Sequence, residues 1–169
     1  AALRAMQVPP TVAGLIERQL ERLPEGVHAM LEAAAVCGPR FGHQLLARLL
    51  AVEPALVQPR CDHLARRGEW LLSDGVEALP GGRLDFRYAF RHAWYQRVLL
   101  DRAMPAQRLQ LHLAAAQAIA GEAHAETRAA EIAHHWEQVL ALAARSGAHL
   151  AEAASQAAAQ RLRAARAAE

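Results

Sequence analysis

The chain has 169 residues, enough for one ordinary domain or for a small domain with a helical extension. About half of its residues are apolar, many of them alanine, and the formal net charge of +2 is too small to indicate nucleic-acid binding by itself. The chain contains no lysine, so it has no complete Walker A phosphate loop and no lysine that could form a Schiff base. A complete P-loop ATPase and an enzyme that uses a Schiff-base lysine are therefore excluded.

The two cysteines, Cys37 and Cys61, fall at apolar positions of predicted helices. We expect both to be reduced, buried thiols, as is usual in a cytoplasmic protein. The sequence shows no signal peptide and no apolar run long enough to span a membrane. Because it begins without Met and ends within a predicted helix, we expect it to be a piece of a longer protein.

Apolar residues at helical spacing predict four helices in the N-terminal half, at about 12–23, 25–37, 42–50 and 54–67. Thr11 is expected to cap the first of these helices. Gly68 suits the left-handed position that follows the fourth. Pro59 lies within the fourth helix, and we expect the first turn there to be kinked or separate.

A β-hairpin is predicted next. Residues 70–72 form a short strand, and a long loop over 73–83 contains two glycine turn signals. Residues 84–90 alternate apolar and polar side chains, which is typical of a half-buried strand that pairs back on the first. From Trp94 the apolar spacing becomes helical, so His92 lies where the strand gives way to a helix. Three helices, a hairpin and a long loop make up a winged-helix domain, here with one extra helix in front.

Helices are predicted from there to the end of the chain, at about 94–104, 105–120, 129–142 and 147–169. Pro105 suits the first position of its helix. We therefore expect a mainly α protein with a winged-helix domain over 8–104 and a helical, TPR-like region over 105–169. Two antiparallel helix pairs in a row favour the start of a superhelix, although no repeat of fixed period is visible.

The adjacent pair His134-His135 raises the question of a metal site. Neighbouring residues on a helix point about 100° apart and no HExxH spacing is present, so no metal ligand set is predicted. We expect Trp136 to anchor a helix pair, with the two histidines beside it. His112 falls next to the apolar stripe of its own helix and is expected to pack or to form an interhelix hydrogen bond.

Four segments carry a resemblance to a known family and occur in the family's order: VPPTVAGLIERQLERLP, MLEAAAVCGPRF, YAFRHAWYQRVLLDRAMPAQRLQLHLAAAQAI and AAEIAHHWEQ. Through them the chain resembles the segment that follows the ATPase core in bacterial STAND-class ATPases, which include ATPase-containing transcriptional regulators. The segments cover most of residues 8–138. The resemblance implies a winged-helix domain, a superhelical region after it, and an AAA-type nucleotide-binding domain before residue 1 in the longer protein.

The resemblance also implies a role for His92. It lies where apoptotic and plant-resistance ATPases have a histidine that touches the β-phosphate of the bound nucleotide, and the neighbouring Arg91 is a second candidate contact. An imidazole donor beside the positive end of a helix suits a diphosphate. Ala93 stands where plant relatives have Asp, so a closed-state lock that needs this Asp is not implied. The alternative interpretation is that His92 caps its own helix or packs under the hairpin loop.

These expectations describe a regulatory, non-catalytic segment of a signalling ATPase. The winged helix would pack on the nucleotide-binding domain and hold the ADP-bound resting state, and the helical region would bind a protein partner or a signal ligand. No cofactor is expected in this chain, while the longer protein would bind ATP and ADP. An uncovered apolar face of the last helix would allow the isolated chain to form a homodimer.

The alternative function is direct DNA binding. Winged helices often read the major groove with their third helix, here about 55–67. Arg60, Arg66 and Arg67 on that helix, with Arg83 or Arg87 on the hairpin, would meet phosphates. Acidic residues on the helix and the hairpin make this function the weaker expectation.

Overall fold

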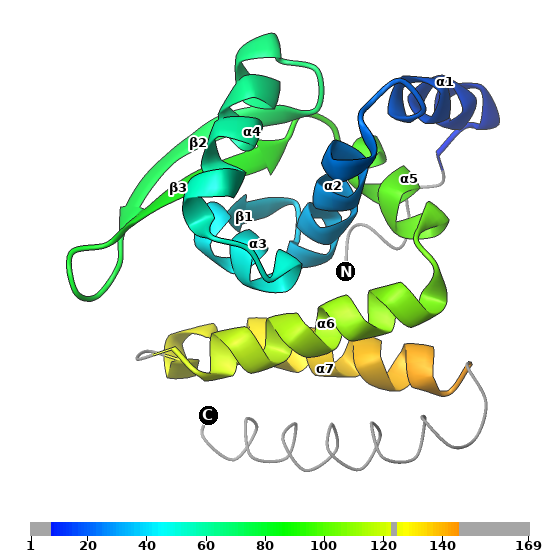
Figure 1. The fold of residues 1–169 in the computed structure, drawn as a ribbon. Helices are drawn as coiled ribbons and strands as arrows, with labels where there is room; N and C mark the ends of the chain where they lie inside the picture. The colour runs from blue at the N-terminus through cyan, green and yellow to red at the C-terminus, as the bar shows by residue number, and fades with distance from the viewer. Residues whose placement is uncertain (1–7, 123–124, 146–169) are drawn as a thin grey trace. The chain divides into compact units, whose positions relative to one another are not determined.

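A computed structural model describes residues 8–122 and 125–145 of the chain. Within these residues the fold is mainly helical, with seven α-helices and one small antiparallel sheet (Figure 1), as the sequence predicts. The chain divides into two compact units between Ala103 and Met104. The predicted helix over 147–169 lies outside the described residues.

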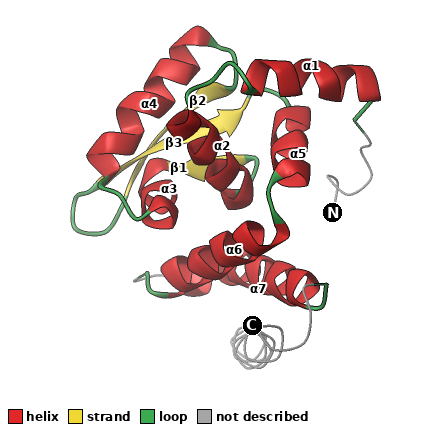
Figure 2. Cartoon of the chain, turned by 45° about the vertical axis from the view of Figure 1, so that its right-hand side comes forward, coloured by secondary structure: helices red, strands yellow, loops and turns green. Residues whose placement is uncertain are grey.

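The first unit contains five helices and three strands. In chain order they are α1 (Pro10–Leu20), α2 (Glu25–Cys37), β1 (Arg40–Gly42), α3 (His43–Leu50), α4 (Pro54–Arg67), β2 (Leu71–Ala78), β3 (Leu84–Phe90) and α5 (Ala93–Arg102). The second unit contains α6 (Pro105–Ala120), the short 3₁₀ helix η2 (Ala125–Arg128) and α7 (Ala129–Ala143). Figure 2 distinguishes these helices and strands by colour.

The sheet has the strand order β1-β3-β2, with antiparallel pairing throughout. Strand β1 was not predicted, because three residues are too short to show an apolar period. Strand β2 is longer than predicted and continues through an irregularity between Ser73 and Val76. The loop between β2 and β3 is therefore 79–83 rather than 73–83, and the hairpin extends past α3 in Figure 1.

Two helix details differ from the prediction. Helix α1 begins at Pro10 after Pro9, so Thr11 lies inside the helix and makes no capping hydrogen bond. Proline at the first helical position already has the φ angle that the helix needs, which explains the earlier start. Helix α4 runs as one element through the exposed Pro59, so the predicted separate first turn is wrong. Gly68 takes the predicted left-handed conformation after α4, with φ 62°.

Helix α2 is the central helix of the first unit, because every residue from Met30 to Cys37 is buried. The sheet adds an aromatic group to the core, with the Phe41 ring centroid 6.0 Å from that of Tyr88 and 5.8 Å from that of Phe90. Other fully buried side chains come from α1, α3, β2 and α5: Leu20, Leu46, Leu71 and Leu99. The core therefore contains side chains from helices before the hairpin, from the helix after it and from the sheet.

The cysteines are free and buried, as predicted. Burial, with a smaller contribution from the neighbouring Asp62 carboxylate, raises the pKa of the Cys61 thiol to about 12. A thiol of this kind stays protonated near neutral pH and is a poor nucleophile.

The described part of the second unit contains two long helices that pack on each other. Helices α6 and α7 lie side by side in both Figure 1 and Figure 2. The residues buried between or under them include small alanines and larger apolar side chains: Leu109, Ala115, Ala116, Ile119, Trp136, Val139 and Leu142. Trp136 is 1% exposed and anchors the pair, as predicted. Across both units, no helix among the described residues has the length and apolar character needed to cross a membrane.

Candidate functional site

The predicted change from strand to helix is confirmed at His92. Strand β3 ends at Phe90, α5 begins at Ala93, and His92 is the N-cap residue with extended backbone angles (φ −137°, ψ 137°). The end of β3 is held by two backbone hydrogen bonds: the Phe90 N–H donates to the Pro39 carbonyl and the Arg91 N–H to the Trp70 carbonyl, both at 3.0 Å. The position of His92 is therefore fixed by backbone contacts on both sides of β3.

The His92 imidazole is exposed and lies on an aromatic surface. Its ring is stacked on that of Trp94, with centroids 5.8 Å apart, and meets the Tyr95 ring edge-on at 6.3 Å. The side chain makes no capping hydrogen bond to α5, and it is not buried under the hairpin loop. His92 is therefore the N-cap residue of α5 without a side-chain cap, its ring packs on two aromatic residues of its own helix, and its predicted contact with a nucleotide stays a prediction.

The first turn of α5 is suited to negative charge. A helix leaves its first N–H groups without intrahelical partners and carries a partial positive charge at this end. The Tyr95 N–H closes the first turn on the His92 carbonyl at 3.1 Å. No acidic residue lies in the first turn of α5, so no carboxylate of the helix itself neutralises this end. An anion beside His92 would meet a helix terminus and an imidazole together.

Arg91 has a structural contact. Its guanidinium Nη1 donates to the carbonyl of Gly68, the left-handed residue that ends α4. A Cβ atom at Gly68 would lie 3.2 Å from that nitrogen, so a larger residue at this position would crowd the Arg91 guanidinium. The geometry thus connects Arg91 to the end of α4, and its predicted contact with a nucleotide stays a prediction.

The buried side-chain amide of Gln96 anchors helix α5 to helix α2. Gln96 is 3% exposed, and its Nε2 donates to the carbonyl of Ala35 in α2 at 2.9 Å. The Tyr95 ring also packs on that of Trp70, with centroids 4.7 Å apart. These contacts hold the helix that carries His92 against the core of the first unit.

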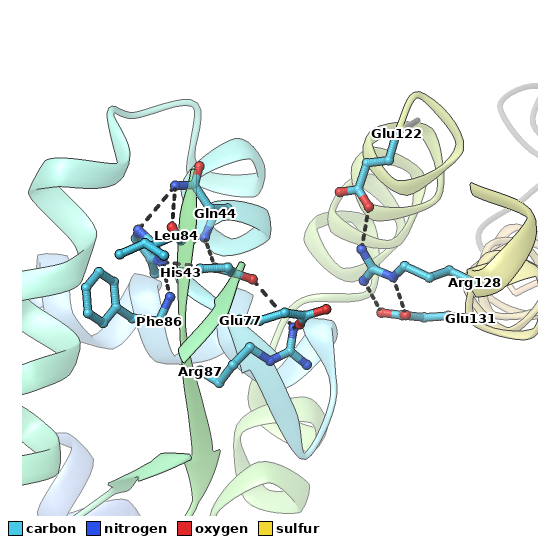
Figure 3. A network of polar contacts seen from close by, with 10 residues as sticks. His43, Gln44, Glu77, Leu84, Phe86, Arg87, Glu122, Arg128 and Glu131 are labelled. Carbon is cyan, nitrogen blue, oxygen red and sulfur yellow. Dashed lines mark hydrogen bonds and ion pairs between the residues drawn. The ribbon is translucent and has the colours of Figure 1, made fainter. Parts of the chain in front are cut away.

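A second polar network lies at the start of α3 and is drawn in Figure 3. Asp85, on β3, accepts the N–H of Gln44 at 3.0 Å and lies 2.9 Å from Nδ1 of His43. The Phe86 N–H lies 3.0 Å from the same His43 nitrogen, which accepts this bond only in the tautomer that does not donate to Asp85. Asp85 therefore caps α3 from a strand that is 41 residues away in sequence.

The alternation of β3 places Asp85 on the outer, polar face, but its side chain is buried. The reason is Gly42, where a Cβ atom would lie 1.8 Å from Asp85 Oδ2. A glycine at this position makes room for the carboxylate, and the guanidinium of Arg87 lies 3.5 Å from the same oxygen. Because His43 is only 3% exposed, the network stabilises the fold and offers no open site for a substrate.

Two of the described histidines of the second unit, His112 and His135, form a hydrogen-bonded pair. Nδ1 of His112 in α6 lies 2.9 Å from Nδ1 of His135 in α7, which confirms the predicted interhelix bond of His112. His134 is exposed whereas His135 is buried, as expected for neighbours on a helix. Among the described residues, no group of three or more histidine, cysteine or acidic side chains is arranged to hold a metal ion.

Comparison of the chain with protein-family models, with curated proteins and with solved structures gave no match in any of the three. The candidate site therefore depends on the geometry of the β3–α5 junction. Its ligand chemistry follows from an exposed imidazole at a helix N-terminus that has no acidic first turn.

Proposed function

We propose that this chain is a regulatory, non-catalytic segment of a STAND-type signalling ATPase. In this proposal, residues 8–104 form a winged-helix domain that packs on a nucleotide-binding domain and stabilises the ADP-bound resting state. The observation that carries it is the placement of His92 at the start of α5, where its side chain is exposed and makes no capping hydrogen bond to the helix. The proposed location is the cytoplasm, where its thiols stay reduced.

The order of elements supports the winged-helix assignment. Helices α2, α3 and α4 are followed directly by the hairpin of β2 and β3, and β1 adds a third strand beside β3. In such a domain the hairpin is the wing, and α5 follows it. The His92 imidazole therefore lies at the exit from the wing, on the surface that a neighbouring domain can reach.

The chemistry of the junction supports a diphosphate as the group that is sensed. The imidazole supplies an N–H donor, and the first N–H groups of α5 supply the partial positive charge. The stacked ring of Trp94 limits the orientations that the imidazole can take. A hydrogen bond from His92 to the β-phosphate of ADP would make the packed arrangement dependent on the nucleotide, so nucleotide exchange would shift the population towards an open arrangement.

In this proposal the second unit receives the input signal. A single hairpin of α6 and α7 is too small to be a receptor by itself, but stacked hairpins of this kind present extended surfaces to ligands. We assign the TPR-like region over 105–169 to binding of a protein partner or a signal ligand. The ATP or ADP belongs to the nucleotide-binding domain.

The test uses the longer protein with His92→Ala. One hydrogen bond to a charged phosphate contributes about 1.5–3 kcal/mol, so ADP should dissociate about tenfold faster or more, and resting output should rise. The matched control is His63→Ala, because His63 is exposed on α4, away from any helix start. Release of ADP from the His92 variant at the rate of the unchanged protein would exclude the sensor role.

A second candidate function is DNA binding through α4. The observation that favours it is the exposure of Arg60, Arg66 and Arg67 on that helix. Arg67 is already paired with Glu69 at 2.7 Å, which weakens its attraction for phosphate. Fluorescence anisotropy at low salt tests this candidate, with Arg60→Gln/Arg66→Gln as the variant. Saturable binding that prefers one sequence and is lost in the variant would favour DNA binding over the regulatory proposal.

A further inference from the structure

The feature that the proposed function leaves unused is the imidazole pair between α6 and α7. His112 is 3% exposed and His135 is 1% exposed, and their Nδ1 atoms lie 2.9 Å apart with ring centroids at 5.2 Å. Nε2 of His135 is buried and has no hydrogen-bond partner among the described residues. Two titratable rings thus face each other in the buried interface between α6 and α7.

The proton count of the pair decides whether the contact is attractive. With both rings neutral, one Nδ1–H donates to the other Nδ1. A first added proton keeps this hydrogen bond but places a charge in a buried interface. It also leaves both nitrogens of the charged ring as donors, and Nε2 of His135 has nothing to donate to. A second proton puts two N–H groups against each other and removes the bond.

The surrounding charges oppose protonation as well. Arg108 on α6 acts on His112, and Arg128 of η2 acts on His135. His134 on α7 acts on both rings, while Glu131 on α7 is the one group that favours a charged His135. Burial is the largest cause, and together these effects lower the pKa of both histidines from the usual 6.5. The Glu131 carboxylate is also held by Arg128 through two hydrogen bonds, at 2.7 and 2.8 Å, and its effect on His135 is smaller than those of burial and His134.

We propose that the His112–His135 pair is a proton-sensitive latch, which holds α6 and α7 together while the rings are uncharged and releases them when the pH falls. Each histidine takes up a proton more readily in the open hairpin than in the closed one. Stability from the pair is therefore complete above pH 6.5 and is lost as the pH falls below it. The hairpin becomes an acid-opened element, independent of any nucleotide.

The first test is histidine NMR of the full chain, following the Cε1–H signals from pH 7.5 to 5.0. A histidine with the ordinary value of 6.5 is almost fully charged at pH 5.0. The signals of His112 and His135, assigned by single substitution, should stay at neutral-ring positions in the closed state throughout this range. Ordinary titration of both rings near pH 6.5 would overturn the proposal.

The second test measures opening by hydrogen exchange of the α7 amides, with rates corrected for the intrinsic effect of pH. The open fraction should rise as the pH falls from 6.5 to 5.0, by up to about tenfold per pH unit for each proton taken up. In His112→Leu/His135→Leu the rise should disappear, whereas the control His63→Gln, at an exposed histidine on α4 in the first unit, should keep it.

A third variant covers the case in which the double substitution does not fold. In His112→Asn an amide takes the place of the Nδ1 atom and can still bond to His135, but it takes up no proton. The pH dependence of α7 opening should then fall to that of a single proton. An unchanged dependence in His112→Asn, or an equal dependence in the double variant, would show that the pair is a packing contact without a switching role.

Discussion

Asp85 on β3 caps helix α3 by accepting the backbone N–H of Gln44 at 3.0 Å. Side-chain caps normally come from the residue directly before the helix, but here Gly42 holds that position and has no side chain to offer. The cap is therefore a tertiary contact, which joins the start of α3 to β3. The same carboxylate lies 2.9 Å from Nδ1 of His43, so one buried group serves both the backbone and a side chain.

Replacing Asp85 with Ala should destabilise the first unit. The change removes the cap of α3 and leaves a buried imidazole with one fewer partner, which together cost about 2–3 kcal/mol. Urea unfolding followed by circular dichroism measures the effect. Asp74→Ala is the control, because Asp74 is exposed and 3.7 Å from Arg40, and it should change stability by less than about 0.5 kcal/mol. Equal losses in the two variants would contradict the cap.

Gly42→Ala tests whether the Asp85 carboxylate needs the space that the glycine leaves. The new methyl group would lie 1.8 Å from Asp85 Oδ2, so the carboxylate or the strand must move. We expect a loss of about 1–3 kcal/mol, as for other overpacked sites. Gly14→Ala is the matched control with the opposite sign: nothing lies within 4 Å of its Cβ position, and alanine inside α1 should stabilise the chain by about 0.5–1 kcal/mol. A neutral Gly42→Ala would show that the carboxylate is free to move.

Removal of the Gln96 amide should loosen α5. In Gln96→Leu the Ala35 carbonyl loses its donor inside the core, which costs about 1–3 kcal/mol even though the shape is nearly kept. Hydrogen exchange should show faster exchange in α5 than in α4. Gln19→Leu, exposed on α1, serves as the control. If α5 and α4 lose protection equally, Gln96 contributes to the core as a whole rather than to the anchoring of α5.

Cys61 should be inert in the folded chain. Burial, together with the Asp62 charge, raises the pKa of its thiol to about 12, so almost no thiolate is present at pH 8. A colorimetric thiol reagent at pH 8 should therefore detect no fast-reacting group in the native chain and two thiols after unfolding, since Cys37 is also free and buried. Rapid reaction of the native chain would show that the first unit opens locally around α2 or α4.

Several helices could be located from the sequence because Pro and Gly mark their ends. Pro54 opens α4 and Gly68 closes it, and Pro105 opens α6, as predicted. The change of apolar period around His92 also gave the junction of β3 and α5 correctly. These are local signals, since each depends on the conformation of a few consecutive residues.

The predictions that were wrong concern residues whose structure depends on neighbours that the local pattern does not show. Strand β1 exists because Phe41 pairs with Tyr88, far along the chain, and its three residues carry no period of their own. Thr11 is a good capping residue, yet α1 starts at Pro10, two residues before the predicted start at 12. Asp85 has the spacing of an exposed residue but is buried, because the space above Gly42 can be seen only once β1 and β3 are paired.

The amino-acid sequence by itself determined the helical character of the chain, most helix boundaries and the placement of His92 where a strand meets a helix. Only the tertiary structure decided that His92 is exposed, that Asp85 caps α3, and that His112 meets His135. The physical reason is the distance along the chain over which each signal acts. Helix periods and turn residues act over a few positions, whereas burial and hydrogen-bond partners depend on which distant segments share the same space.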